Sequence, residues 1–143
     1  TKHCVSSATF NVVQRTKVKI EGENVNILSK GKGTTARDIQ KCIDCSDWML
    51  IPYNKYQYRL TASGIFWDSI ANNKPIIGLG SAYLKDYMGK YQIGIWEEKT
   101  NKICERLKNL DKENYRDFSK GINEFIKIIE VENEKIVSDI LLK

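Results

Sequence analysis

The sequence predicts a single α/β domain of the Rossmann-like type, in which helices cover both faces of a parallel sheet. Short apolar segments alternate with amphipathic segments along most of the chain, and short polar loops separate them. Strands that alternate with helices imply right-handed βαβ crossovers, and such crossovers produce a parallel sheet. The length of 143 residues suits one domain with its own core. We therefore expect three layers, α/β/α.

The amino-terminal half contains two predicted strands and one predicted helix. Val25–Leu28 has a short apolar strand pattern and leads into a loop rich in glycine and lysine. Thr35, with Asp38 three residues later, predicts a helix start, and the apolar face of that helix continues to about Cys45. Residues 47–53 form an apolar run interrupted only at its end by proline, which is typical of a strand buried on both faces.

The carboxyl-terminal half continues this alternation. Residues 61–64 form a turn, Ile65–Ala71 a short amphipathic helix that two asparagines end, and Ile76–Leu79 a buried strand. The elements predicted after it are a helix from Ser81 to Gly89, a strand at Gln92–Trp96, a helix from Thr100 and a longer helical region from Asp111. The first 20 residues are ambiguous, since Cys4–Val5 and Val12–Ile20 fit either a strand and a helix or an edge hairpin.

The composition bears on the class of protein. Hydrophobic residues make up 41% and charged residues 29% of the sequence, which is typical of a folded domain rather than a disordered chain. No apolar run approaches the ~20 residues that span a bilayer, so we expect a cytoplasmic protein. The net charge of +5 fits a solvated lysine-rich surface, anionic ligands such as nucleotide diphosphates, or an anionic membrane surface. No arginine-rich run is interleaved with aromatic residues, which argues against nucleic acid.

Few residues offer catalytic or metal chemistry. Cys42 and Cys45 have the spacing of a zinc knuckle or a redox pair, but no second pair with that spacing exists, and this pair lies late in a predicted helix. We interpret them as two semi-buried thiols in a reducing compartment. His3 is the only histidine, so no Ser-His-Asp or Cys-His set can be assembled. The sequence therefore predicts no metal, no cofactor and no assignable catalytic residue.

The basic, glycine-containing loop Ser29–Thr35 suggests a P-loop, but the motif fails. Lys32 is followed by Gly33 instead of serine or threonine, and Asn26 stands where the first glycine of the motif would fall. The loop around Lys32 could still present backbone N–H groups to a nucleotide. An ordinary flexible turn is the alternative.

The turn and helix that follow residue 60 form the strongest candidate site. Ser63-Gly64 stands at a helix N-terminus, where free N–H groups and the positive end of the helix dipole favour a phosphate, and Thr61 opens the same turn. Asp68 lies about one helical turn further on, where its carboxylate could reach a sugar hydroxyl. This combination predicts a nucleotide or nucleotide-sugar site. An exposed helix aspartate with no ligand is the alternative.

The predicted sheet places other loops beside this turn. Ligands of parallel α/β sheets bind beyond the carboxyl ends of the strands, so the loops after Leu28, Tyr53 and Leu79 should share one rim with the turn. A nucleotide base could lie against Tyr53, whose alternative role is packing within its loop.

Three motifs follow one another in a recognisable order. They are Asp47-Trp-Met-Leu-Ile-Pro-Tyr53, Ser63-Gly64, and Asp68-Ser-Ile-Ala-Asn-Asn-Lys-Pro-Ile-Ile77. This order resembles the C-terminal, donor-nucleotide-binding domain of GT-B glycosyltransferases of the large family 4 type. Gly89–Gly94 and Asp117–Ser119 resemble later segments of that family, and the similarity covers roughly Val25–Phe125.

The resemblance implies one half of a metal-independent hexosyltransferase. Such an enzyme transfers a sugar from a nucleotide-diphosphate donor, for example a UDP- or GDP-sugar, to a saccharide or lipid-linked acceptor, as in polysaccharide biosynthesis. Asp68 matches the family's second glutamate, which accepts hydrogen bonds from the donor ribose. Leu60 replaces the first glutamate, so the contact with the donor sugar departs from the family pattern.

The resemblance also bears on domain organisation. The family's strand and loop with a diphosphate-binding Arg and Lys are not found before Val25, and neither is its N-terminal domain, which supplies the acceptor site. We therefore expect residues 1–143 to be a single truncated donor-binding domain, inactive alone, with residues 111–143 as a helical C-terminal extension. The expected partners are the nucleotide-sugar donor and the missing N-terminal domain, and the full-length enzyme could contact a membrane peripherally.

A non-catalytic flavodoxin-like α/β module that binds a protein partner is the alternative function. It predicts one complete five-stranded sheet and no response to nucleotides. A phosphoacceptor receiver domain is a poor fit within this class, because such a domain needs an aspartate at the end of its third strand, whereas Asp47 precedes its strand.

Overall fold

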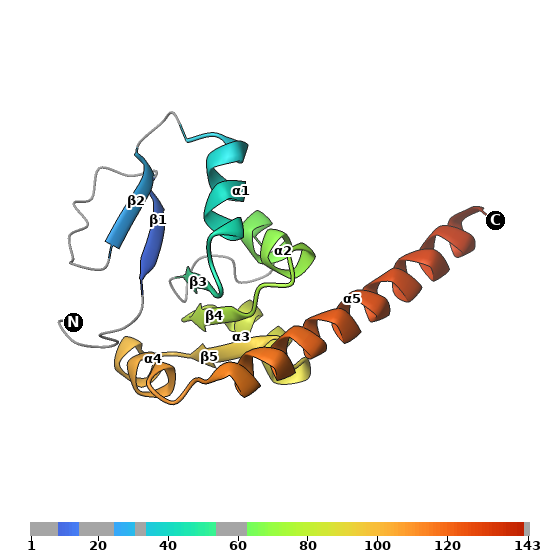
Figure 1. The fold of residues 1–143 in the computed structure, drawn as a ribbon. Helices are drawn as coiled ribbons and strands as arrows, with labels where there is room; N and C mark the ends of the chain where they lie inside the picture. Colours follow the sequence, from blue (N-terminus) through green and yellow to red (C-terminus); the bar gives the residue numbers. More distant parts are fainter. Residues whose placement is uncertain (1–8, 15–24, 31–33, 54–62, 142–143) are drawn as a thin grey trace.

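Parallel strands alternate with helices in the computed structural model, which describes residues 9–14, 25–30, 34–53 and 63–141 (Figure 1). The strands are β1 (Phe10–Gln14), β2 (Val25–Lys30), β3 (Met49–Pro52), β4 (Ile76–Leu79) and β5 (Gly94–Glu97). The helices are α1 (Ala36–Asp44), α2 (Gly64–Ala71), α3 (Ala82–Lys90), α4 (Thr100–Leu107) and α5 (Lys112–Leu141). The α/β class predicted from the sequence is therefore confirmed for this part of the chain.

The described strands form two parallel sheets, whereas the sequence predicted one. β1 pairs with β2, and β3, β4 and β5 form a second sheet with β4 in the centre. Figure 1 shows the β1–β2 pair standing apart from the three-stranded sheet. Element alternation predicts parallel pairing but not which strands pair, because that choice depends on contacts between distant residues. Neither interpretation of the first 20 residues began a strand at Phe10.

The start of α1 confirms the cap predicted from Thr35 and Asp38. The Thr35 hydroxyl accepts a hydrogen bond from the Asp38 N–H at 3.3 Å, and the Asp38 carboxylate accepts one from the Thr35 N–H at 2.8 Å. These two bonds form a capping box, which satisfies N–H groups that a helix start otherwise leaves unpaired. The backbone and hydroxyl hydrogen bonds from Thr35 lower the pKa of Asp38 below its ordinary value.

One face of the three-stranded sheet is closed by three helices. Its cluster of buried residues consists of Ile51, Phe66, Ile70, Ile76, Leu84, Ile93, Ile122 and Phe125, from β3, β4, α2, α3, α5 and the segment before β5. Alternate residues of a strand point to opposite faces, which is why Ile51 and Ile76 face this cluster while Ile77 faces the other.

The opposite face is covered mainly by α4. Ile77 and Ile95 pack there against Ile103 of α4, and Phe118 at the start of α5 packs against the same cluster. Helices therefore lie on both faces of the β3–β4–β5 sheet. This layering agrees with the predicted α/β/α arrangement at the level of the three-stranded sheet.

The long helix α5 joins the two faces and then leaves the domain. Gly121 lets the helix approach the chain before β5, because a Cβ at that position would lie 2.0 Å from the Gln92 carbonyl oxygen. Ile122 and Phe125 are buried beyond it, whereas Ile136 and Ile140 are exposed. The carboxyl-terminal half of α5 accordingly extends beyond the rest of the described residues in Figure 1.

Candidate functional site

The candidate site is the amino end of α2, at the carboxyl edge of the three-stranded sheet. Ser63 is the N-cap residue: its hydroxyl accepts a hydrogen bond from the Phe66 N–H at 3.4 Å. The Ser63 carbonyl accepts hydrogen bonds from the N–H groups of Phe66 at 3.1 Å and Trp67 at 3.5 Å. The helix start predicted at Ser63-Gly64 is therefore confirmed, and two of its N–H groups are used internally.

The other two N–H groups at this end remain open. Within the described residues, the N–H groups of Gly64 and Ile65 have no hydrogen-bond partner. Gly64 is exposed, and a Cβ built on it would meet no atom within 4 Å. α2 has no acidic residue in its first turn, so no side chain of that turn neutralises the positive end of its dipole. An anion can approach these N–H groups from solvent.

Tyr53 fixes the position of this helix start. Its hydroxyl donates a hydrogen bond to the Ser63 hydroxyl oxygen, which joins the end of β3 to the start of α2. The half-buried Tyr53 ring also packs against the core on the closed face. The Ser63 hydroxyl is thus engaged by Tyr53 and Phe66, and the groups left for a ligand are backbone N–H groups. Sequence reasoning missed this bond, since no local pattern links residues ten positions apart.

Asp68 lies on the exposed side of α2 together with Gly64. Residues four apart share one face of a helix and are separated by about 6 Å along its axis. The Asp68 carboxylate has no hydrogen-bond or ion-pair partner within the described residues, whereas its backbone carbonyl accepts hydrogen bonds from the backbone and side chain of Asn72. The carboxylate is therefore available to a ligand that contacts Gly64. This arrangement suits a diphosphate linked to a sugar that carries hydroxyl groups.

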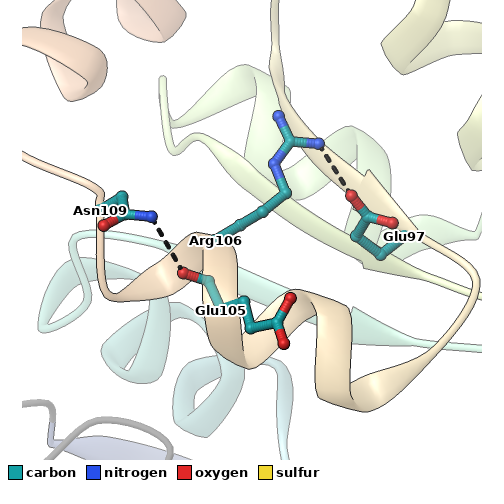
Figure 2. A network of polar contacts seen from close by, with 4 residues as sticks. All are labelled: Glu97, Glu105, Arg106 and Asn109. Carbon is teal, nitrogen blue, oxygen red and sulfur yellow. Dashed lines mark hydrogen bonds and ion pairs between the residues drawn. The ribbon is translucent and has the colours of Figure 1, made fainter.

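Part of the predicted rim is present at this edge. In the parallel register Pro52 lies beside Leu79 and Leu79 beside Glu97, so the ends of β3, β4 and β5 are level. Glu97 ends β5 at this edge, and Arg106 of α4 forms an ion pair with its carboxylate at 3.1 Å (Figure 2). β2 belongs to the other described sheet, so the prediction that its carboxyl end shares this edge is not confirmed. Lys32 and Thr61 lie outside the described residues.

A second helix also begins at this edge, and it differs from α2. Ser81 precedes α3 as Ser63 precedes α2, and each is followed five residues later by an exposed aspartate, Asp86 and Asp68. Ser81 is fully buried, and its carbonyl accepts a hydrogen bond from the Trp96 indole N–H at 3.1 Å. The first residue of α3 is Ala82, which has a methyl side chain, whereas the first residue of α2 is Gly64, which has no side chain. Neither helix has an acid in its first turn, and Ser81 makes no side-chain cap hydrogen bond, so the two starts differ in the Ser63 cap and in the glycine at the first position of α2.

Cys42 and Cys45 are not disulfide-bonded. Cys42 is buried and Cys45 is exposed, so the prediction of two semi-buried thiols is wrong for Cys45. Burial raises the pKa of the Cys42 thiol, which keeps it in its unreactive protonated form. Cys104 on α4 is disulfide-bonded, an unexpected finding for a chain assigned to a reducing compartment.

Neither a metal site nor a membrane span is found among the described residues. No group of three His, Cys, Asp or Glu side chains in this part of the chain could hold a metal ion. None of its helices combines the length and the apolar character needed to cross a bilayer. Comparisons of the chain with known protein families, with curated proteins and with solved structures found no match.

Proposed function

We propose that this chain is the nucleotide-sugar-binding domain of a glycosyltransferase. The enzyme would transfer a sugar from a nucleotide-diphosphate donor, such as a UDP- or GDP-sugar, to a saccharide or lipid-linked acceptor. The observation that carries the proposal is the open start of α2: the N–H groups of Gly64 and Ile65 and the Asp68 carboxylate have no partner among the described residues, and Gly64 and Asp68 are both exposed. The motif resemblance described above supports the same assignment.

The proposed chemistry is stabilisation of the leaving diphosphate. When the bond between the sugar and the diphosphate breaks, negative charge grows on the phosphate oxygens. The N–H groups of Gly64 and Ile65 and the helix dipole are already oriented toward such a charge, and preorganised donors stabilise a transition state without further rearrangement. Asp68 would accept hydrogen bonds from the ribose hydroxyls, which places the diphosphate over the helix start.

The proposal assigns binding to this domain and catalysis to a larger assembly. No catalytic residue is assigned here, and the acceptor site would come from an N-terminal domain of the same enzyme. The chain alone should therefore bind a nucleotide without transferring sugar. A cytoplasmic location and a peripheral membrane contact of the whole enzyme belong to the proposal. A disulfide at Cys104 argues against a cytoplasmic location, because disulfides are rare in reducing compartments. Alkylation of protein isolated without reductant tests whether the Cys104 thiol is free.

Titration of the chain with UDP and GDP, followed by the backbone amide signals in NMR spectra, tests the site. We expect the largest shifts at Gly64 and Ile65, whose N–H groups are open, and smaller shifts at Asp68. Shifts confined to other segments, or no shifts at millimolar nucleotide while the spectrum stays folded, would contradict the assignment. If neither UDP nor GDP changes the amide signals, the alternative function, a non-catalytic α/β module that binds a protein partner, is favoured.

The variant Asp68→Asn tests the ribose contact. Replacing the charged acceptor should weaken nucleotide binding by about tenfold, because hydrogen bonds to charged groups contribute roughly 1.5–3 kcal/mol. The matched control is Asp86→Asn, which makes the same change at the equivalent exposed position of α3. Equal effects of the two variants would show that net charge matters and that Asp68 makes no specific contact.

A further inference from the structure

The carboxyl end of α1 carries two thiols that differ in exposure. Cys42 is 8% exposed, whereas Cys45, the C-cap residue, is open to solvent, and neither is disulfide-bonded. Residues three positions apart lie on one face of a helix. Burial raises the pKa of the Cys42 thiol, and the charge of the neighbouring Cys45 thiolate adds a smaller rise. The two thiols are therefore close enough to interact.

A disulfide between these thiols requires a small movement at the helix end. Cβ atoms three residues apart in a regular helix are separated by about 5–6 Å, whereas a disulfide needs about 3.5–4.5 Å, so Cys45 has to approach Cys42 by roughly 1–2 Å. The backbone of Cys45 has already left helical geometry, with ψ at 3°, and its side chain is exposed, so it can move without disturbing the core. A bridge closed in this way is strained, and strained disulfides are readily reduced again.

The place of the pair on α1 indicates which thiol chemistry it supports. Cysteine pairs that catalyse thiol–disulfide exchange stand at a helix amino terminus, where N–H groups and the helix dipole stabilise a thiolate. Cys42 and Cys45 lie at the opposite, carboxyl end of their helix. We therefore expect the pair to be oxidised by small molecules rather than to catalyse exchange in other proteins. The exposed Cys45 can meet such a molecule first, because Cys42 is buried.

We propose that Cys42 and Cys45 are a modification site, which forms a reversible disulfide by exchange with a small-molecule disulfide. The Cys45 sulfur attacks one sulfur of the small disulfide, which forms a mixed disulfide and releases one small thiol that carries the Cys45 proton. The Cys42 sulfur then attacks the Cys45 sulfur, which closes the bridge and releases a second small thiol with the Cys42 proton. Two protein thiols are oxidised, and one small disulfide is reduced to two thiols. The second step is intramolecular, which offsets the small fraction of thiolate at the buried Cys42.

Incubation of the whole chain with glutathione disulfide, followed by alkylation, trypsin digestion and mass spectrometry, tests the proposal. Cleavage after Lys41 and Lys55 releases residues 42–55, which contain Cys42 and Cys45 and no other cysteine. We expect this peptide to carry neither alkyl groups nor glutathione, because the bridge consumes both thiols. Excess reduced glutathione before alkylation should restore both alkyl groups. A peptide that stays fully alkylated, that keeps glutathione as its final state or that is linked to a second copy would overturn the proposal.

The variants Cys42→Ala and Cys45→Ser separate the two steps. Cys45 should keep its glutathione in Cys42→Ala, because no thiol remains to displace it. Glutathione should add about tenfold more slowly or less to Cys45→Ser, whose remaining thiol is buried. Equal addition to the two variants would contradict the proposed order of attack. If Cys42→Ala does not fold, the time course of the parent chain tests the same order, since the mixed disulfide at Cys45 should precede the bridge. None of these results depends on nucleotide binding.

Discussion

The starts of α1 and α2 look alike in the sequence and behave differently in the structure. Each helix follows a strand and begins after a hydroxyl residue, Thr35 or Ser63, whose side chain accepts from the N–H three residues on. At α1 the Asp38 carboxylate accepts a hydrogen bond from the Thr35 N–H and places a negative charge at the helix start. At α2 the first turn has no acid, and Tyr53 engages the serine from a distant part of the chain.

This difference is the basis for choosing α2 in the proposed function. A helix start that supplies its own carboxylate gains stability and leaves little attraction for an external anion. Tyr53 holds the start of α2 in place through its hydrogen bond to Ser63. The N–H groups of Gly64 and Ile65 stay open among the described residues. The structure therefore distinguishes a helix start that carries its own acid from one whose first turn has none.

The largest expected effect comes from giving α2 the acid that it lacks. In Gly64→Asp a carboxylate would occupy the open N–H groups and repel phosphate, so the affinity for UDP or GDP should fall tenfold or more, a change of about 1.4 kcal/mol or above. Folding should not suffer, since the space around Gly64 is open. Isothermal titration calorimetry measures the affinity, and thermal unfolding checks the fold.

Ala82→Asp is the matched control, because it places the same charge at the first residue of α3. Nucleotide affinity should be nearly unchanged in this variant. If it falls as much as in Gly64→Asp, the added charge acts without regard to its position, and the choice of α2 as the binding helix is wrong.

A smaller effect is expected from removing the hydrogen bond between Tyr53 and Ser63. Ser63→Ala removes the N-cap and should lower the free energy of unfolding by about 1 kcal/mol, as for other N-cap serines. Urea unfolding of Ser63→Ala, Tyr53→Phe and the double variant forms a double-mutant cycle. We expect a coupling of about 0.5–1.5 kcal/mol, the range for residues in one hydrogen-bond network. Strictly additive losses would mean that Tyr53 does not support the helix start.

The smallest effect should be the pH dependence of the α1 cap. The pKa of Asp38 is held below its ordinary value of 3.8 by the hydrogen bonds from Thr35, so folding favours the ionised form. Its contribution to stability is present above pH 3.8 and is lost as the pH falls through the lower pKa of the folded state. Asp38→Asn should therefore be slightly less stable than the parent chain at neutral pH. Unfolding curves measured near pH 2 should show a smaller difference, and a constant difference would contradict the cap.

Much of the local structure could be predicted because its causes are local. The bounds of β4 at Ile76–Leu79 agree with the sequence prediction, and the capping box at Thr35 follows from two residues three positions apart. α3 continues past Gly89 by one residue, since glycine lowers helix propensity without forbidding another residue. Within the candidate site, Ser63 and Gly64 could be placed at a helix start, and Asp68 one turn along the same helix.

The remaining features depend on contacts across the chain. The division into two sheets is one example, because the apolar pattern of a strand does not name its partner. The exposure of Leu50 is another: it lies in an apolar run that predicts burial on both faces, yet α4 covers only its neighbours. The ion pair between Glu97 and Arg106 likewise removes one acid from the sheet edge, and the sequence alone did not indicate it.

By itself the sequence determined the α/β class, the order of the elements from β2 onward and the residues that start α1 and α2. These depend on the spacing of apolar residues and on hydrogen bonds within one turn of helix. The tertiary structure decided which helix start Tyr53 contacts, which of the described strands share a sheet and that Leu50 stays exposed. Those outcomes depend on which distant segments come into contact, as Tyr53 does with Ser63, and periodicity within one segment cannot specify such a contact.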